Sequence, residues 1–365
     1  MLDTFFYKEN FKLESGAVLK QYRLAYTTYG TLNNAGDNVI WIFHALTANS
    51  NPDEWWPGLV GEGKLFDPAH YFIVCVNMPG SCYGSIGPLD KMDETPGNTG
   101  DKLWLHDFPF FTPRDMARAF MPLRTLLGIK KIYIGIGGSM GGQQLLEWAI
   151  QEPDLFTYIL PIATNAIHSP WGIAFNATQR LCIEADPTWM DKHPGAGISG
   201  MKVARAIALI SYRNYDTYQL SQAETDGNLI GPFKSESYQR YQGEKLARRF
   251  NAFSYYKLTQ SMDSHNVGRG RGNVRTALKS IRAKTLVIGI ENDILFPPRE
   301  QQFLADNIEG ASLKLISSLY GHDGFLLEYE QIEKLIRSFI GEQITTAATV
   351  GGTKHLGSLQ KKVKT

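Results

Sequence analysis

The sequence contains little cysteine, almost no excess charge and no long apolar run. Among its 365 residues are three scattered cysteines, Cys75, Cys82 and Cys182, which form neither a CxxC pair nor a zinc-type set with histidines. We therefore expect reduced thiols, no bound metal and a cytoplasmic location. No stretch approaches the roughly 18 apolar residues of a membrane span, and the N-terminus does not have the pattern of a signal peptide.

The charges of the chain are nearly balanced. Lys and Arg number 37 against 36 Asp and Glu, a formal net charge of +1. This balance argues against a nucleic acid or an anionic membrane as partner, so an anionic ligand would need a local cluster of cations. The hydrophobic content of 43% is enough for a large buried core.

Short apolar runs without polar alternation predict buried parallel strands. They lie at residues 39–43, 71–76, 132–136, 159–162, 285–290 and 313–316. Residues 114–127 and 143–150 have helical spacing and fall between some of these runs. Alternating strands and helices predict an α/β fold with a mostly parallel sheet covered on both faces.

The alternation stops between about residues 165 and 279, where the sequence is helix-like and rich in aromatic residues. We interpret residues 166–279 as a helical lid inserted into one core, formed by residues 1–165 and 280–342. Residues 343–365 are rich in Gly, Thr and Lys, which predicts a loose tail.

The most informative motif is Gly137-Gly138-Ser139-Met140-Gly141, a G-x-S-x-G pattern between a predicted strand and a predicted helix. In α/β hydrolases this turn exposes a nucleophilic serine, and small neighbours prevent clashes in the strained backbone. A phosphate loop is the competing interpretation, but the G-x-x-x-x-G-K-[ST] pattern is absent. We therefore predict an α/β-hydrolase fold with Ser139 as nucleophile.

In this fold an acid and then a histidine follow the serine along the chain. Asp293 comes directly after a predicted strand, and Glu291 is a competing candidate for the acid. His322 follows the last predicted strand in a loop with glycines on both sides, whereas His106, a weak rival, precedes the serine. We predict a catalytic triad of Ser139, Asp293 and His322.

The oxyanion hole of such a site uses two backbone amides. One belongs to the residue after the nucleophile, which is Met140, and the other comes from the turn after an earlier strand. By position we assign the second amide to Leu46, and we expect His44 to be a structural residue of that turn.

Several longer stretches resemble the homoserine O-acyltransferases, especially homoserine O-acetyltransferase, up to about residue 341. The matching stretches are His44 to Thr47, Asn77 to Pro88, Gly137 to Trp148, Ala174 to Asn176 with Arg180, Tyr238 to Gly243, Gly268 to Gly272, Asp293 with Leu295 to Pro297, and His322 to Phe325. Together they are far more specific than G-x-S-x-G alone.

The resemblance implies acetyl transfer from acetyl-CoA, a co-substrate and not a bound cofactor, to the hydroxyl of L-homoserine in methionine biosynthesis. It implies a Ser139 acyl-enzyme, a lid that limits hydrolysis, and a homodimer built through the lid helices. It also implies that Arg180 pairs with the carboxylate of the amino acid and that Asp323 meets its ammonium group.

Alternatives remain at this point. Arg180 could be a surface arginine and Asp323 a carboxylate that fixes its loop. Arg269 and Arg271 could attract CoA phosphates or join the lid to the core. The chain also departs from the family pattern at Ala48-Asn49, at Ser81, at residues 103–106 and at residues 251–255.

These departures leave the acceptor and the donor open. Succinyl-CoA or another hydroxy amino acid could replace the expected substrates. A carboxylester hydrolase with the same triad and a non-catalytic binding protein are the other functional classes.

Overall fold

The computed structural model describes residues 2–92 and 101–341, and its centre is an eight-stranded sheet. The strand order is β1-β4-β6-β5-β7-β8-β9-β10. The bounds are β1 Leu2–Tyr7, β4 Tyr22–Tyr29, β5 Val39–Phe43, β6 Phe72–Val76, β7 Ile132–Gly138, β8 Phe156–Ile162, β9 Lys284–Ile290 and β10 Ser312–Ile316, with β2 Phe11–Lys12 and β3 Val18–Leu19 paired separately. All neighbours from β6 to β10 are parallel, which confirms the predicted α/β-hydrolase architecture.

The six predicted strands correspond to β5 to β10, whereas β1 and β4 had no counterpart in the prediction. Both lie at one edge of the sheet, where β4 pairs antiparallel with β1 and with β6. Most residues of β1 are exposed, and β4 carries Arg23, Thr27 and Thr28. Neither strand has the continuous apolar run that marks a strand buried on both faces.

Two hydrophobic clusters fill the two faces of the sheet. Along β5, Trp41 belongs to one cluster with Trp148, and Ile40 and Ile42 belong to the other with Ile332. Both faces are therefore dry, which explains why the residues of β5 are all apolar.

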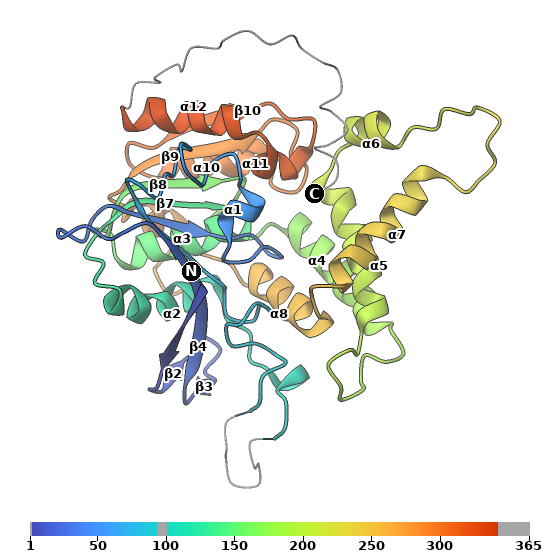
Figure 1. Ribbon diagram of the computed structural model, residues 1–365, viewed down its shortest axis with the longest axis horizontal. Coiled ribbons are helices and arrows are strands. Elements are labelled where there is room, and N and C mark those ends of the chain that lie inside the picture. The colour runs from blue at the N-terminus through green and yellow to red at the C-terminus, as the bar shows by residue number, and fades with distance from the viewer. Residues whose placement is uncertain (1, 93–100, 342–365) are drawn as a thin grey trace.

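Helices cover both faces. Their bounds are α1 Pro52–Trp55, α2 Pro113–Leu126, α3 Met140–Gln151, α10 Pro298–Asn307, α11 Gly324–Leu327 and α12 Tyr329–Ile340, with one-turn 3-10 helices η1 Leu105–Asp107 and η2 Gly321–Asp323. Figure 1 shows α12 on one side of the sheet and α2 and α3 on the other, as the two clusters require.

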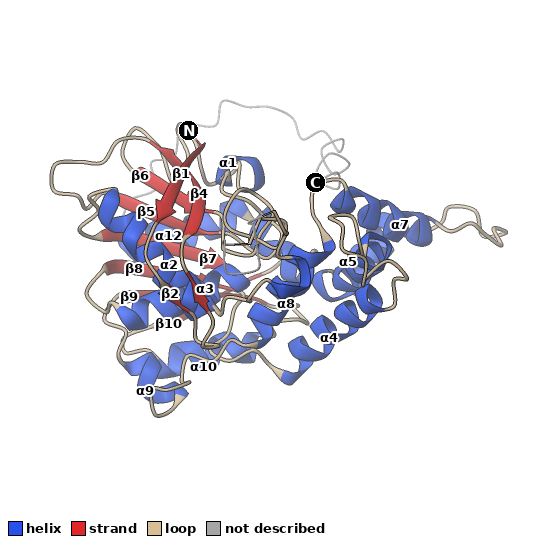
Figure 2. Cartoon of the chain, turned by 90° about the horizontal axis from the view of Figure 1, so that it is seen from below, coloured by secondary structure: helices blue, strands red, loops and turns tan. Residues whose placement is uncertain are grey.

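Between β8 and β9 the chain forms helices only. They are α4 Pro170–Glu184, α5 Ile198–Tyr212, α6 Tyr215–Gln222, α7 Lys234–Ala247, α8 Ala252–Asp263 and α9 Val274–Lys279. Helices α4, α5 and α7 gather to one side of the strands in both views (Figures 1 and 2), whereas α9 contacts α10 of the core. We call α4 to α8 the lid.

Two further sequence-based expectations concern the tail and membrane spans. The predicted tail, residues 343–365, lies outside the described residues. No helix in the described ranges is long and apolar enough to cross a lipid bilayer.

Candidate active site

Ser139 stands between the end of β7 and the start of α3, in a backbone conformation that few L-residues adopt. Its φ is 56° and its ψ is −125°. The Ser139 amide donates to the Ile162 carbonyl at 2.9 Å, and the Thr164 hydroxyl donates to the Ser139 carbonyl at 2.8 Å. These bonds to the end of β8 and the residues after it hold the strained turn in place.

Glycines beside Ser139 are required by close backbone approach. A Cβ on Gly137 would lie 2.6 Å from the backbone of Gly141, and a Cβ on Gly141 would lie 2.1 Å from the Phe43 carbonyl oxygen. The start of α3 is therefore pressed against the turn and against the end of β5.

Asp293 and His322 form a buried hydrogen-bonded pair. His322 Nδ1 lies 2.6 Å from Asp293 Oδ2, and the two side chains are 3% and 0% exposed. The other carboxylate oxygen of Asp293 accepts from the amides of Leu295 and Phe296 at 2.8 and 2.9 Å. Glu291, the competing acid, is exposed. The structure therefore pairs Nδ1 of His322 with Asp293 and leaves Nε2 of the imidazole free to accept a proton.

Aromatic contacts connect His322 to the turn of Ser139, through Phe325, and to the lid, through Tyr212. The His322 ring stacks on Phe296 at 5.1 Å, meets Phe325 edge-on at 5.3 Å and lies 5.8 Å from Tyr212 at the end of α5. Phe325 in turn covers Gly138, where a Cβ would come within 2.4 Å of its ring. The rival His106 instead meets the rings of Trp189 and Phe253 edge-on.

The two predicted oxyanion donors lie on adjoining elements. Leu46 follows β5, and Met140 is the first residue of α3, whose first amides have no partner within the helix. Both residues are buried, at 5% and 0% exposure. The close approach of Gly141 to Phe43 brings these two elements together, as the predicted oxyanion hole requires.

His44 fixes the turn that carries Leu46, as we expected. Its Nδ1 donates to the Ala45 carbonyl at 2.9 Å, and its Nε2 accepts from the Met78 amide at 3.1 Å. An acceptor nitrogen requires a neutral ring. Burial agrees with this, since it lowers the pKa of His44 to about 4.

Three buried histidines predict a loss of stability in acid. Burial lowers the pKa of His44 to about 4 and the pKa of His168 and of His265 to about 3, each from 6.5. As the pH falls, the unfolded chain therefore binds these protons before the folded protein does. The free energy of unfolding is not reduced by these histidines above pH 6.5, and it decreases as the pH drops from 6.5 toward the pKa values of the folded protein. Each histidine contributes about 1.4 kcal/mol per pH unit to the slope of the unfolding free energy against pH in that window.

Denaturant titrations from pH 7 to pH 4.5 measure this slope. It should decrease by about that amount in His44→Gln and stay unchanged in the control His193→Gln, since His193 is exposed.

The two predicted substrate-binding residues each contact an opposite charge of the protein. Arg180 of α4 pairs with Asp263 of α8 at 2.7 Å, whereas Asp323 pairs with Arg213 at 2.8 Å. Arg213 directly follows α5 and was not predicted, because no sequence pattern connects the end of a lid helix to the loop of His322. The structure thus adds Arg213 to the residues that contact the loop of His322.

Arg269 and Arg271 join the lid to the core. Arg269 pairs with Glu14 at 2.8 Å, and Arg271 pairs with the buried Glu147 of α3 at 2.7 Å. Arg114 contacts both carboxylates at 2.8 and 3.0 Å. Because these arginines are already neutralised, we do not assign them to CoA phosphates.

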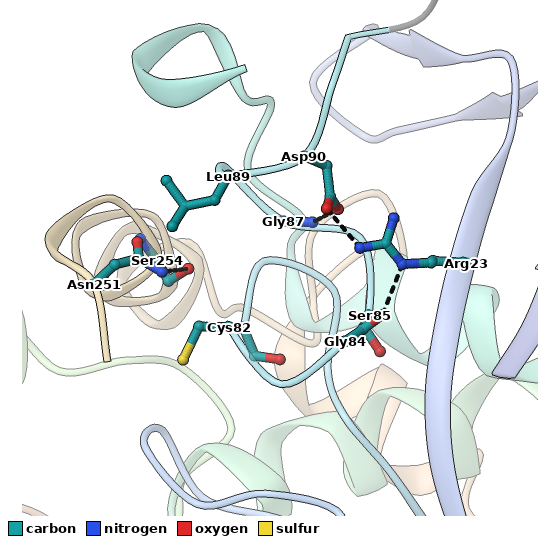
Figure 3. Close-up of a pocket in the computed structure, with 10 residues that line it drawn as sticks. Arg23, Cys82, Gly84, Ser85, Gly87, Leu89, Asp90, Asn251 and Ser254 are labelled. Atoms are coloured by element: carbon teal, nitrogen blue, oxygen red, sulfur yellow. Dashed lines mark hydrogen bonds and ion pairs between the residues drawn. The ribbon is translucent and has the colours of Figure 1, made fainter. Parts of the chain in front are cut away.

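A small cavity of about 80 Å³ lies between the core and α8, and no triad residue lines it (Figure 3). Its charged residues neutralise each other, since Arg23 pairs with Asp90 at 2.5 Å and donates to the Gly84 carbonyl at 2.9 Å. The Gly87 amide donates to Asp90 at 2.7 Å. We interpret the cavity as a packing feature of the loop from Asn77 to Pro88, which contributes five of its lining residues.

Comparison with known proteins assigns this arrangement to a family. The family described as alpha/beta hydrolase fold matches residues 38–329. A homoserine O-acetyltransferase of Cyclobacterium marinum is 48% identical over 337 residues, which cover 92% of this chain and 94% of that protein. The chain belongs to the homoserine O-acetyltransferase family. It is therefore an acyltransferase, as its sequence motifs predicted.

Solved structures of an acyltransferase and of a hydrolase share this fold. Homoserine O-acetyltransferase from Bacillus anthracis matches with a TM-score of 0.84 and 24% identity, over 94% of this chain and 98% of that one. An acetylester hydrolase from Corynebacterium glutamicum matches with a TM-score of 0.81 and 25% identity, over 94% and 96%. The fold alone does not distinguish transfer from hydrolysis.

Proposed function

We propose that the protein transfers an acetyl group from acetyl-CoA to the hydroxyl of L-homoserine through a Ser139 acyl-enzyme, a step of methionine biosynthesis. Its family membership, at 48% identity to a homoserine O-acetyltransferase over 92% of the chain, carries the choice of reaction. The His322–Asp293 pair, which Phe325 connects to the turn of Ser139, supports the chemistry. Its cytoplasmic location stays a prediction.

The first half-reaction acylates the enzyme. With Nδ1 of His322 held by Asp293, Nε2 takes the proton of the Ser139 hydroxyl as Oγ attacks the thioester carbonyl. The amides of Leu46 and Met140 stabilise the oxyanion, and the carbon–sulfur bond then breaks. The departing CoA thiolate receives the proton from His322.

The second half-reaction releases the product. His322 takes the proton of the homoserine hydroxyl, whose oxygen attacks the acetyl-Ser139 carbonyl. The Ser139 oxygen leaves, recovers the proton from His322, and O-acetylhomoserine departs. The imidazolium in each step is stabilised by the buried Asp293 carboxylate.

An assay of thioester consumption with and without homoserine tests this proposal. CoA release that depends on homoserine and yields O-acetylhomoserine supports it, whereas equal release without homoserine supports the esterase alternative that the acetylester hydrolase structure suggests. Parallel assays with succinyl-CoA as donor and serine as acceptor test the two substrates.

Arg213 and Asp323 are suited to hold the amino-acid part of the acceptor. Asp323 is next to His322 in the chain, and its ion pair places Arg213 at the same loop. Both side chains are 13% exposed, so the pair is within reach of a ligand. A zwitterion complements this pair, with its carboxylate on the guanidinium and its ammonium on Asp323. Arg180, which pairs with Asp263 away from the His322 loop sequence, is the second candidate for the carboxylate.

Two matched variants separate these arginines. We expect Arg213→Gln to raise the KM for homoserine by about 10- to 100-fold, because a charge-assisted hydrogen bond contributes about 1.5–3 kcal/mol. Acetylation of Ser139 in the absence of homoserine should change little. The same measurements on Arg180→Gln give the control, and a rise in KM only in that variant would assign the carboxylate to Arg180.

We also infer a homodimer formed through the lid. The segment from α6 to α7 projects from the molecule in Figure 1 and exposes apolar side chains, which include Leu220, Ile230, Phe233 and Tyr241. Ile230 is 94% exposed, and apolar residues grouped in this way are typical of an interface.

Sedimentation velocity tests the dimer. Ile230→Asp combined with Phe233→Asp should convert it to a monomer, since both charges would be buried in the interface. Leu126→Asp, at an exposed apolar position of α2, should leave the dimer intact. A dimer that survives the first pair of changes would place the interface elsewhere.

A further inference from the structure

The amide of Leu46, a predicted oxyanion donor, belongs to the same planar peptide group as the Ala45 carbonyl. That carbonyl accepts two hydrogen bonds, from Nδ1 of His44 at 2.9 Å and from the Ala48 amide at 3.0 Å. Both bonds fix the orientation of the peptide plane and hence the direction of the Leu46 N–H. The position of the Ala48 amide therefore bears directly on the oxyanion donor.

The Ala48 amide in turn shares a planar peptide group with the Thr47 carbonyl. That carbonyl oxygen accepts from Nη1 of Arg249 at 2.5 Å and from the Tyr83 hydroxyl at 3.5 Å. Nη1 of Arg249 also donates to the Tyr83 hydroxyl. Arg249 lies between α7 and α8 and so belongs to the lid, whereas Thr47 and Tyr83 belong to the core. The lid thus holds the second of two peptide groups that are connected in series.

These bonds form one chain that runs in a single donor-to-acceptor direction. It starts at the Arg249 guanidinium, passes through the peptide group of Thr47 and Ala48, and ends at the N–H of Leu46. A bond to the carbonyl oxygen of a peptide group makes its N–H a stronger donor, because hydrogen bonds in series polarise one another. A charged donor has a larger effect than a neutral one. Because Arg249 is exposed and water screens its charge at a distance, this direct contact is the route by which it acts.

Contacts of the neighbouring backbone hold Arg249 and Tyr83 in place. The Cys82 thiol donates to the Arg249 carbonyl at 3.3 Å, and the Asn77 side-chain amide donates to the Tyr83 carbonyl at 2.8 Å. The ring of Phe250 meets the ring of Tyr83 edge-on at 5.8 Å. Burial raises the pKa of the Tyr83 hydroxyl, so this group keeps its proton and remains a donor.

We propose that Arg249 and Tyr83 are positioning residues of the oxyanion hole, which act on the Leu46 amide through the two peptide groups described above. This inference rests on the proposed acyl-enzyme chemistry, since the oxyanion forms when Ser139 attacks the thioester. The two side chains act through the backbone and need no contact with the substrate. Loss of their hydrogen bonds should therefore slow the steps in which the oxyanion forms and leave the binding of the donor unchanged.

Arg249→Met removes the charged donor and keeps an unbranched side chain. The maximal rate of Ser139 acetylation, measured as the burst of CoA release without homoserine, should fall about tenfold, less than the loss of about 10²- to 10³-fold when an oxyanion donor is removed outright. The acetyl-CoA concentration that gives half of this rate should change by less than about twofold. Arg249→Lys keeps a charged donor and should recover most of the rate, and Tyr83→Phe should lose about threefold.

A tetrahedral probe without CoA separates this role from a contact with the donor. In methylboronic acid the Ser139 oxygen adds to boron, the serine proton passes to His322, and one boron-bound oxygen takes the place of the oxyanion. Its inhibition constant should rise about tenfold in Arg249→Met, in proportion to the loss of acetylation rate, as expected for an analogue of the transition state. A role confined to folding or to CoA binding would leave this constant unchanged.

Arg248→Met is the matched control, because Arg248 is exposed and directly precedes Arg249. It should leave both measurements at their wild-type values. An unchanged boronate constant in Arg249→Met would overturn the proposal, and so would a change only in the acetyl-CoA concentration for half the maximal rate. If Arg249→Met does not fold, as thermal unfolding would show, Tyr83→Phe makes the same test, since it keeps the ring that contacts Phe250.

The positioning role and the proposed reaction fail in different ways. The boronate constant does not depend on the acceptor. If the wild-type protein consumes the thioester equally without homoserine but Arg249→Met weakens the boronate, the positioning role stands and the proposed transfer fails. If turnover depends on homoserine but Arg249→Met binds the boronate like the wild type, the transfer stands and the positioning role fails.

Discussion

Replacing Ser139 by alanine should reduce homoserine-dependent consumption of acetyl-CoA by on the order of 10⁴- to 10⁶-fold, the range seen when the nucleophile of a triad is removed. The hydroxyl is the group that becomes acylated, so no neighbouring side chain replaces it. The fold should persist, because Thr164 and Ile162 hold the turn through the backbone of residue 139 and not through its hydroxyl.

Intact-protein mass spectrometry checks this result independently of turnover. After incubation with acetyl-CoA alone, the wild-type protein should carry one additional acetyl group, and Ser139→Ala should carry none. Ser280→Ala, at an exposed position after α9, is the control and should be acetylated like the wild type. Turnover by Ser139→Ala at more than a hundredth of the wild-type rate would refute the acyl-enzyme mechanism.

Replacing Asp293 by asparagine should lower kcat by about 10⁴-fold, the effect of this change in a serine protease triad. The carboxylate accepts the Nδ1 proton of His322 at 2.6 Å, which leaves Nε2 free to accept the proton of Ser139. An amide NH₂ in that position favours the opposite tautomer, with the proton on Nε2. The asparagine oxygen can still accept from the amides of Leu295 and Phe296, so the loop should keep its shape.

Glu291→Gln is the matched control for this prediction. Glu291 follows the same strand two residues earlier and was the competing acid, but its side chain is exposed. Its neutralisation should change kcat by less than about twofold. A large loss in Glu291→Gln together with an active Asp293→Asn would reverse the assignment of the acid.

The features that the sequence predicted are those with a local physical cause. Gly137 and Gly141 are needed because backbone atoms of Gly141 and Phe43 come within 3 Å of where a Cβ would lie. Strands buried on both faces have uniformly apolar residues, so β5 to β10 could be predicted. The order of acid and histidine then followed from the ends of β9 and β10.

The features that the sequence did not predict depend on contacts between distant segments. Arg213 is significant because it meets Asp323, and β4 is a strand because β1 and β6 flank it. The Arg213–Asp323 ion pair and the pairing of β4 with β1 and β6 exist only in the folded chain. The charge or amphipathic character of one position does not indicate which distant residue it will contact.

Two of the segments that depart from the family pattern, residues 103–106 and 251–255, contact each other. His106 and Phe253 belong to separate segments that differ from the usual family sequence, and their rings lie 4.9 Å apart. Trp189 contacts both, at 4.5 and 4.9 Å. The two segments therefore pack together where the lid meets the core. In the segment that carries Phe253, the Asn251 side chain caps α8 as an aspartate would.

The contact between α5 and the loop of His322 limits how this enzyme can be redesigned. Tyr212 lies against the His322 ring, and Gly321 is so close to the Tyr212 carbonyl that a Cβ there would lie 3.0 Å from the oxygen. A chimera that exchanges the lid for that of another hydrolase would therefore also alter the support of His322, the proposed general base. Lid grafts intended to change the acceptor should retain the last turn of α5 and Arg213, which follows it.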